Sequence, residues 1–292
     1  MRQGAKKAQV GKACAGQQSG WLLSHCLVIL CGMAAGEGAW RRFLMRLDGK
    51  VAIVTGGGSG FGEGIVRKFA AEGAQVIVMD RDEAGAVRVA ESAGGACRAF
   101  VGDVSLPAGM EGAREAAISA FGRLDILVNN AGVGHVPTAL EDVDEATFER
   151  IADVNMRSVY NGARAMVPHF KAQRSGAILN VASTGGVSPR PNLTWYNASK
   201  GWVITATRAM AVELAPFGIR VNAINPVAGD TPLLATFMGA DTPEMRAKFL
   251  STIPLGRFST PQDMGNAAAF LCSEEASMIT GIAMEVDGGR CI

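Results

Sequence analysis

Short runs rich in β-branched residues alternate with longer amphipathic stretches from about residue 50 to the end of the chain. This alternation is typical of a parallel sheet covered by helices on both faces. The predicted strands are Val51–Thr55, Gln75–Met79, Cys97–Val101, Ile126–Asn129, Ala177–Val181, Arg220–Ile224 and Ala283–Val286. The predicted helices are Gly60–Glu72, Glu83–Ser92, Ala108–Phe121, Glu145–Gln173, Tyr196–Ala215, Pro243–Leu250 and Pro261–Cys272. We therefore expect a single α/β domain over residues 46–292, doubly wound around a seven-stranded parallel sheet.

The first 45 residues do not follow this pattern. Basic residues precede an apolar run, Trp21–Met33, that Ser24 and His25 interrupt. A membrane-spanning helix needs about 20 apolar residues, so this run is too short and too polar to cross a bilayer. A basic start before a short apolar run also has some likeness to a secretory signal, which is the alternative. We expect an N-terminal extension that is disordered or results from a mis-assigned start, with ordered patterning from just after Met45.

The composition argues against several classes of protein. The formal net charge is +1, from 28 basic and 27 acidic residues, so no broad basic face for nucleic acid is expected. The six cysteines include no C-x-x-C pair and only three histidines are present, so local spacing predicts no metal site. Free thiols fit a reducing compartment, and we expect a cytoplasmic protein that binds neither membranes nor nucleic acid.

A glycine-rich turn, Thr55–Gly62, joins the first predicted strand to the first predicted helix. Glycine lets the backbone approach a pyrophosphate closely, and the positive N-terminus of the following helix then faces the phosphates. Such a turn alone could be an ordinary loop, but its place between a strand and a helix favours dinucleotide binding and a Rossmann-type fold. The predicted cofactor contacts in this turn are Gly56, Ser59, Gly60, Phe61 and Gly62.

Asp80 ends the second predicted strand, about 20 residues after the glycine turn, where a ribose-binding carboxylate is expected. A 2′-phosphate about 5 Å from this carboxylate would meet a repulsion of roughly 3 kcal/mol per unit charge at an effective dielectric of about 20. NAD(H) is therefore the predicted cofactor, and NADP(H) is the less favoured alternative. Arg81, a further predicted cofactor contact, could offset part of the repulsion. Asp80 could also cap the helix that begins near Glu83.

Two further strand ends are expected at the same edge of the sheet. Asp103 and Val104 follow the third strand, and Asn130, Ala131 and Gly132 follow the fourth. Small and amide-bearing residues there would border the adenine, so all five are predicted to contact the cofactor. Each segment could instead be a simple turn, because Asn, Asp and Gly favour turns.

The fifth predicted strand leads into Ser183, and the next helix opens with Tyr196-Asn197-Ala198-Ser199-Lys200. Tyr196 and Lys200 have i,i+4 spacing and so share one face of the helix. A tyrosine packed at an interface beside a solvated lysine would show the same spacing. Ser183, however, follows the carboxyl end of a strand and precedes Tyr196 closely in the sequence. We therefore expect both side chains to point into the same crevice.

Together these motifs resemble those of the short-chain dehydrogenase/reductase family over residues 46–292. The resemblance rests on Thr55–Gly62, Asp80, Asp103, Asn129–Gly132, Asn155, Ser183, Tyr196, Lys200 and Val286–Gly289. It implies a catalytic tetrad, Asn155, Ser183, Tyr196 and Lys200, of which the last two also contact the cofactor. It further implies a homotetramer, where the sequence alone also permits a dimer, and cofactor contacts from Pro226 and Thr231 after the sixth strand. The family pattern has glycine after this proline, whereas this chain has Val227, which leaves the path of the loop open.

The resemblance implies that Tyr196 exchanges a proton with the substrate while a hydride moves between nicotinamide and substrate. The ordinary tyrosine pKa of about 10 is too high for a base at neutral pH, and lowering it by about three units takes about 4 kcal/mol. A positive charge about 5 Å away supplies roughly 3 kcal/mol, so Lys200 and oxidised nicotinamide are expected to lower the pKa of Tyr196. Ser183 would hold the substrate oxygen. Asn155 would anchor a water or, alternatively, satisfy backbone groups at a kink.

Residues 231–260 are expected to form a mobile apolar lid over a small-molecule substrate, although the Met and Phe residues there could simply be core. His135 could line the pocket or lie on the surface. The predicted function is an NAD(H)-dependent oxidoreductase acting on a secondary alcohol or ketone, such as a 3-oxoacyl thioester, a sugar or a small alcohol. A non-catalytic dinucleotide-binding sensor on the same scaffold is the alternative.

Overall fold

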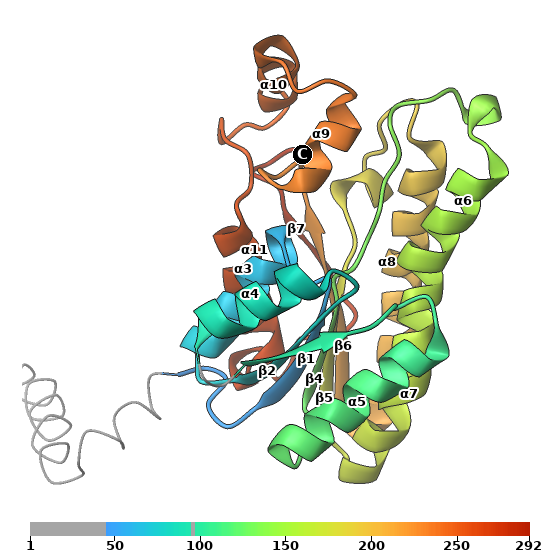
Figure 1. The fold of residues 1–292 in the computed structure, drawn as a ribbon. Coiled ribbons are helices and arrows are strands. Elements are labelled where there is room, and N and C mark those ends of the chain that lie inside the picture. Colours follow the sequence, from blue (N-terminus) through green and yellow to red (C-terminus); the bar gives the residue numbers. More distant parts are fainter. Residues whose placement is uncertain (1–44, 95–96) are drawn as a thin grey trace, which may run out of the picture. The chain divides into compact units, whose positions relative to one another are not determined.

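The computed structural model describes residues 45–94 and 97–292, and the expectations for residues 1–44 lie outside this range. In the described part, seven strands form one sheet with parallel neighbours throughout. Their order is β3-β2-β1-β4-β5-β6-β7, so the chain starts near the middle and winds outward to both edges (Figure 1). The strands are β1 (Val51–Thr55), β2 (Gln75–Asp80), β3 (Cys97–Val101), β4 (Ile126–Asn129), β5 (Gly176–Val181), β6 (Ile219–Pro226) and β7 (Ala283–Val286). The predicted doubly wound sheet is confirmed.

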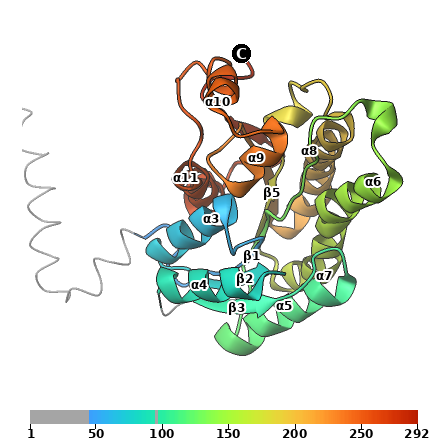
Figure 2. The same ribbon diagram turned by 45° about the horizontal axis from the view of Figure 1, so that its top comes forward.

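Helices cover both faces of the sheet (Figure 2). Ala52 and Val54 of β1 share a core with α3, α4 and α11, whereas Val51 and Ile53 share one with α5, α7 and α8. Because consecutive side chains of a strand point to opposite faces, β1 is buried on both, which explains its unbroken apolar run. The helices are α3 (Gly60–Ala71), α4 (Glu83–Ala93) and α11 (Pro261–Cys272) on one face, and α5 (Pro107–Phe121), α7 (Ser158–Gln173) and α8 (Thr194–Leu214) on the other.

One predicted helix, Glu145–Gln173, is divided in the structure. α6 (Glu145–Ile151) passes into a π-helical segment (Ala152–Arg157), and α7 follows directly. A π-helical turn accommodates an extra residue, and such turns are frequent at functional sites. This one contains Asn155, whose side chain bonds outside the helix, as described below. The predicted helical range is confirmed, but the π-helical turn within it was not predicted, because apolar spacing does not distinguish α-helical from π-helical turns.

The segment predicted as a lid contains two short helices, α9 (Pro232–Met238) and α10 (Pro243–Leu250). Each begins with a proline that follows an extended threonine. The sequence predicts α10 but misses α9, which is too short to show an apolar period. Leu234, Met238 and Phe249 form a small apolar cluster of their own between these helices. The mobility of this segment stays a prediction.

Short 3₁₀ turns occupy Leu140–Asp142, Thr184–Gly186, Ala215–Phe217 and Glu274–Ala276. Over residues 45–94 and 97–292, no helix combines the length and the apolar character needed to cross a bilayer. All seven strands point the same way, so their carboxyl ends meet at one edge of the sheet. The loops that leave this edge form the site described next.

Candidate active site

A cavity of about 340 Å³ lies at the carboxyl ends of the strands. Loops that follow β1 to β6 form its walls. Every residue predicted to contact the cofactor lines it: Gly56, Ser59, Gly60, Phe61, Gly62, Asp80, Arg81, Asp103, Val104, Asn130, Ala131, Gly132, Tyr196, Lys200, Pro226 and Thr231. Ser183 lines it as well, whereas Asn155 is not among the lining residues. The structure thus brings together residues that the sequence places at separate strand ends.

The glycine turn brings the start of α3 into this cavity. Gly56 and Gly60 have positive φ angles of 62° and 53°, in the left-handed region that favours glycine. At Gly62 an added Cβ would lie 2.0 Å from the carbonyl oxygen of Gly56, so only glycine fits there. Ser59 precedes the helix without a side-chain capping bond. The first turn of α3 therefore keeps backbone N–H groups available for an anion, and it fits the pyrophosphate of a dinucleotide.

The ends of β1 and β4 are tied together beside the glycine turn. The hydroxyl oxygen of Thr55 accepts hydrogen bonds from the backbone N–H groups of Asn130 and Ala131, each at 3.0 Å. The side-chain amide of Asn130 donates to the carbonyl oxygens of Thr55 at 2.8 Å and Gly56 at 3.1 Å. Asn130 thus fixes the backbone of the turn.

Asp103 forms a tight turn with Ser105, as the alternative to a cofactor contact predicted. One carboxylate oxygen accepts hydrogen bonds from the backbone N–H of Ser105 at 2.8 Å and from its hydroxyl at 2.7 Å. This turn still places Asp103 and Val104 on the cavity wall.

Asp80 reaches the glycine turn from the end of β2. Its Oδ2 accepts a hydrogen bond from the backbone N–H of Gly58 at 2.9 Å, and its Oδ1 accepts one from the N–H of Asp82 at 3.1 Å. The N-cap residue of α4 is Asp82, so Asp80 does not cap this helix. Asp80 instead fixes Gly58 and keeps a carboxylate on the cavity wall, where it fits the hydroxyls of a ribose.

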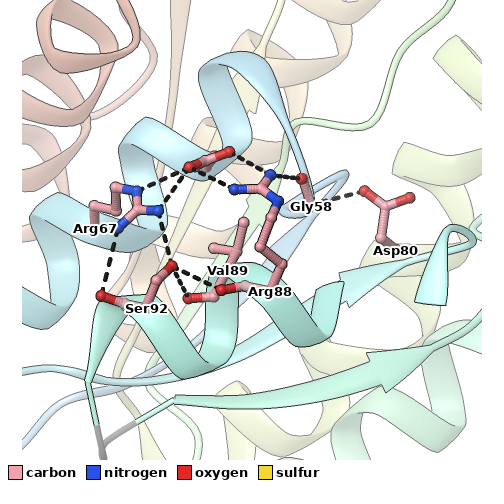
Figure 3. Close-up of polar contacts among 7 residues, drawn as sticks. Gly58, Arg67, Asp80, Arg88, Val89 and Ser92 are labelled. Carbon is pink, nitrogen blue, oxygen red and sulfur yellow. Dashed lines mark hydrogen bonds and ion pairs between the residues drawn. The ribbon is translucent and has the colours of Figure 1, made fainter. Parts of the chain in front are cut away.

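Arg88 of α4 holds Gly58 from the other side (Figure 3). Its guanidinium donates to the carbonyl oxygen of Gly58 at 2.8 Å and pairs with Glu63 of α3 at 2.7 Å. Glu63 also pairs with Arg67, which donates to the hydroxyl of Ser92 in α4. The pKa of Glu63 is lowered, with the hydrogen bond from Arg88 as the largest cause. The sequence does not predict Arg88, because it stands at an ordinary polar position of a helix and carries no motif.

Tyr196 and Lys200 lie in the first turns of α8, and both are buried in the cavity wall. The Nζ of Lys200 donates a hydrogen bond to the carbonyl oxygen of Val181, the last residue of β5, at 2.8 Å. Burial lowers the pKa of Lys200 to about 8. Burial also raises the pKa of Tyr196 to about 12, and a hydrogen bond with Ser183 opposes this shift. In the ligand-free protein, desolvation of the phenolate therefore dominates. The lowering expected from Lys200 together with oxidised nicotinamide stays a prediction.

Asn155 lies behind this pair in the π-helical segment. Its Oδ1 accepts a hydrogen bond from the backbone N–H of Val133 at 2.8 Å, and its Nδ2 donates to the carbonyl oxygen of Val133 and the hydroxyl of Ser199, each at 3.0 Å. It thereby satisfies backbone groups, as its alternative role requires. A Cβ added to Gly132 would lie 3.3 Å from Lys200 Nζ and 3.5 Å from Asn155 Oδ1, so both groups face Gly132. A catalytic role for Asn155 stays a prediction.

Apolar side chains close the cavity around Tyr196. The ring of Phe237 in α9 lies 4.8 Å from the ring of Tyr196, centroid to centroid. Phe249 of α10 and Arg190 also line the cavity. Arg190 was not predicted from the sequence, although a signal existed, because a segment that joins Ser183 to Tyr196 must pass the crevice that both residues face.

The structure shows the surroundings of Val227 and His135, which the sequence left open. Val227 does not divert the loop after β6, because its backbone N–H bonds the carbonyl oxygen of Val286 at 3.4 Å and continues the pairing of β6 with β7. His135 is buried, and it lines a separate cavity together with Gly134 and Arg150. Within the described ranges, no group of three or more His, Cys, Asp or Glu residues is arranged to hold a metal ion.

The chain is similar to several known proteins over most of its length. Residues 56–290 match the family model described as Enoyl-(Acyl carrier protein) reductase. The chain is 48% identical to 4-formylbenzenesulfonate dehydrogenase TsaC1/TsaC2 of Comamonas testosteroni, over 85% of this chain and 100% of that protein. It is 38% identical to the 3-oxoacyl-[acyl-carrier-protein] reductase FabG of Thermotoga maritima, with the same coverage of both. A crystal structure of 3-ketoacyl-(acyl-carrier-protein) reductase from Brucella melitensis complexed with NADH is 56% identical, covers 84% of this chain and 100% of that chain, and has a TM-score of 0.81.

Replacing Arg88 with methionine should loosen the glycine turn, because the bond to the Gly58 carbonyl is lost. Such a bond contributes about 1 kcal/mol, so we expect the Kd for NADH, measured by fluorescence titration, to rise about fivefold. Arg67→Met is the matched control, since it removes a partner of Glu63 without touching the turn, and its Kd should stay unchanged. Equal effects of the two substitutions would contradict this role of Arg88.

Proposed function

The chain belongs to the short-chain dehydrogenase/reductase family, and on that premise we propose that it transfers a hydride between NAD(H) and a carbinol or carbonyl carbon. It is an oxidoreductase, as are the relatives named as dehydrogenases and reductases, and their names lend no support to a non-catalytic sensor. The observation that carries the proposal is the placement of Ser183, Tyr196 and Lys200 in the cavity that the glycine turn opens. When bound there, the nicotinamide accepts or supplies the hydride.

Each of the three side chains has a hydrogen-bonding group that could serve this chemistry. The Oγ of Ser183 accepts the backbone N–H of Gly185 at 3.0 Å, and its hydroxyl bonds Tyr196, a partner that a substrate oxygen could replace. Lys200 uses one of three N–H donors on Val181, and the others could hold the nicotinamide ribose. Tyr196 is the group that exchanges the proton with the substrate oxygen.

The protonation state of Tyr196 bears on the direction of the reaction. Because its pKa is raised to about 12, the ligand-free phenol is protonated at neutral pH. A protonated phenol can donate to the oxygen that gains charge when a carbonyl is reduced. Alcohol oxidation needs the phenolate, which a nearby positive charge favours. The phenol is therefore the proton donor in carbonyl reduction, and the phenolate is the acceptor in alcohol oxidation.

Tyr196→Phe tests the proposal directly, because it removes the proton donor and keeps the ring. General acid catalysis contributes about 10²–10⁴-fold in rate, so kcat for a panel of aldehydes and ketones, followed by NADH absorbance, should fall about thousandfold. Tyr160→Phe is the control, since Tyr160 is the other tyrosine of the chain and is 52% exposed on α7. Wild-type turnover by Tyr196→Phe would contradict the proposed role.

Asp80 supports NAD(H) rather than NADP(H) as the cofactor. Both carboxylate oxygens accept backbone hydrogen bonds, so the charge is fixed where a 2′-phosphate would meet it. Arg88 contacts the same turn, but it pairs with Glu63. The carboxylate of Glu63 offsets the positive charge of Arg88 that would otherwise attract a 2′-phosphate. The similar structure from Brucella melitensis was solved with NADH.

Asp80→Asn keeps the shape of the side chain and removes its charge. We expect the ratio of kcat/KM for NADH to that for NADPH to fall about tenfold or more, because the repulsion is gone while a carbonyl oxygen remains for Gly58. Asp82→Asn is the matched control, since this neighbouring acid does not line the cavity, and its ratio should stay unchanged. An unaltered ratio in Asp80→Asn would show that Asp80 only supports the turn.

For the substrate we propose an aldehyde or ketone and the corresponding alcohol. The names of relatives include a 4-formylbenzenesulfonate dehydrogenase, a 3-oxoacyl-[acyl-carrier-protein] reductase and a galactitol 2-dehydrogenase, so they share the reacting group and not the rest of the molecule. Phe237 and Phe249 on the cavity wall fit an apolar substrate body better than a sugar.

We propose a homotetramer whose subunits pair through α7 and α8, with the terminal Gly288–Ile292 segment against a neighbour. Tyr160, Trp202 (39% exposed) and Val212 (80% exposed) leave apolar surface on these two helices. Covering such surface with a second copy is favourable.

The cytoplasmic location also stays a proposal, and the free thiols of Cys97 and Cys272 are compatible with it.

A further inference from the structure

Arg190 is a cation in the cavity wall that the proposed chemistry does not use. It lies on the segment between β5 and α8 and lines the cavity. Its carbonyl oxygen accepts a hydrogen bond from the side chain of Asn197 at 2.8 Å, and Asn197 directly follows Tyr196. The backbone of Arg190 is thus fixed against the first turn of α8, near the proposed proton donor.

The guanidinium of Arg190 is held in place without being neutralised. Its Cζ lies 4.3 Å from the ring centroid of Phe249, and one N–H donates to the hydroxyl of Thr252 at 3.2 Å. In residues 45–94 and 97–292 no carboxylate forms an ion pair with it, whereas Arg246 of α10 pairs with Asp241. The charge of Arg190 therefore remains available to a ligand in the cavity.

Burial and a second cation make this unpaired charge costly. The pKa of Arg190 is lowered, mainly by burial and further by the positive charge of Arg290. Arg290 donates to the hydroxyl of Ser188 at 3.0 Å, and its Nε is buried without a hydrogen-bond partner. Desolvated like charges of this kind are stabilised when an anion binds between or beside them.

We propose that Arg190 binds an anionic oxygen group of the substrate, which is then an aldehyde, ketone or alcohol that carries a carboxylate or similar oxyanion. This inference rests on the function proposed above and adds the substrate class to it. The planar guanidinium matches a carboxylate through two parallel hydrogen bonds. Phe237 and Phe249 cover the apolar part of such a molecule, between the oxyanion and the carbon that faces Tyr196.

Benzoate binding tests the anion site without turnover. We expect NADH-saturated protein to bind benzoate in calorimetric titrations and to bind the neutral isostere benzamide about tenfold more weakly. Arg190→Gln should weaken benzoate binding by about tenfold or more, and Arg190→Lys should retain part of it. Arg246→Gln is the matched control, because its guanidinium already pairs with Asp241, and it should bind benzoate as the wild type does. Equal affinity for benzoate and benzamide, or no loss in Arg190→Gln, overturns the proposal.

Turnover of 4-formylbenzoate and of its neutral methyl ester separates this inference from the proposed function. We expect the wild-type kcat/KM to favour the acid about tenfold, and Arg190→Gln to remove that preference. Equal turnover of both compounds by the wild type would overturn the anion site and leave the oxidoreductase standing. Benzoate binding that depends on Arg190, with no turnover of either compound, would support the anion site and count against the proposed function.

Discussion

A buried hydrogen bond from Lys200 to the carbonyl oxygen of Val181 joins the end of β5 to the first turns of α8. Removing an ammonium group from water costs free energy, and the lowered pKa of Lys200 reflects this cost. The hydrogen bond offsets part of it and fixes the charge where the loops after β4 and β5 meet, close to Gly132. Tyr196 lies one helical turn earlier. The fold thus keeps a costly charge at the place where the proposed chemistry needs one.

Much of this arrangement follows from local physics and could be predicted from the sequence. β1 is apolar throughout because it is buried on both faces, and Gly56 adopts a positive φ that favours glycine. Parallel strands bring their carboxyl ends to one edge of the sheet. Asp80 and Thr231, which were predicted as cofactor contacts after different strands, therefore line one cavity. The i,i+4 spacing of Tyr196 and Lys200, together with Ser183 at the end of a strand, predicted that both lie in its wall.

The features that the sequence did not predict depend on contacts between distant segments. The π-helical turn that carries Asn155 was not predicted, and its side chain bonds Val133 in the loop after β4 and Ser199 of α8. Arg88 of α4 bonds Gly58 in the glycine turn, and the backbone of Arg190 is bonded by Asn197 of α8. The raised pKa of Tyr196 in the ligand-free protein was not predicted, since one nearby charge can be inferred from spacing and the desolvation by all surrounding atoms cannot. The lowering by Lys200 together with oxidised nicotinamide stays a prediction.

The ionisation of Tyr196 is the most direct test of the role proposed for this side chain. The chain has two tyrosines, so Tyr160→Phe leaves Tyr196 as the only phenol, and its ionisation can be followed by ultraviolet absorbance. We expect a pKa of about 12 in the ligand-free protein and a lower one when NAD⁺ saturates the site. A pKa of about 10 in the ligand-free protein, as for an exposed tyrosine, or no change on adding NAD⁺, would contradict that role.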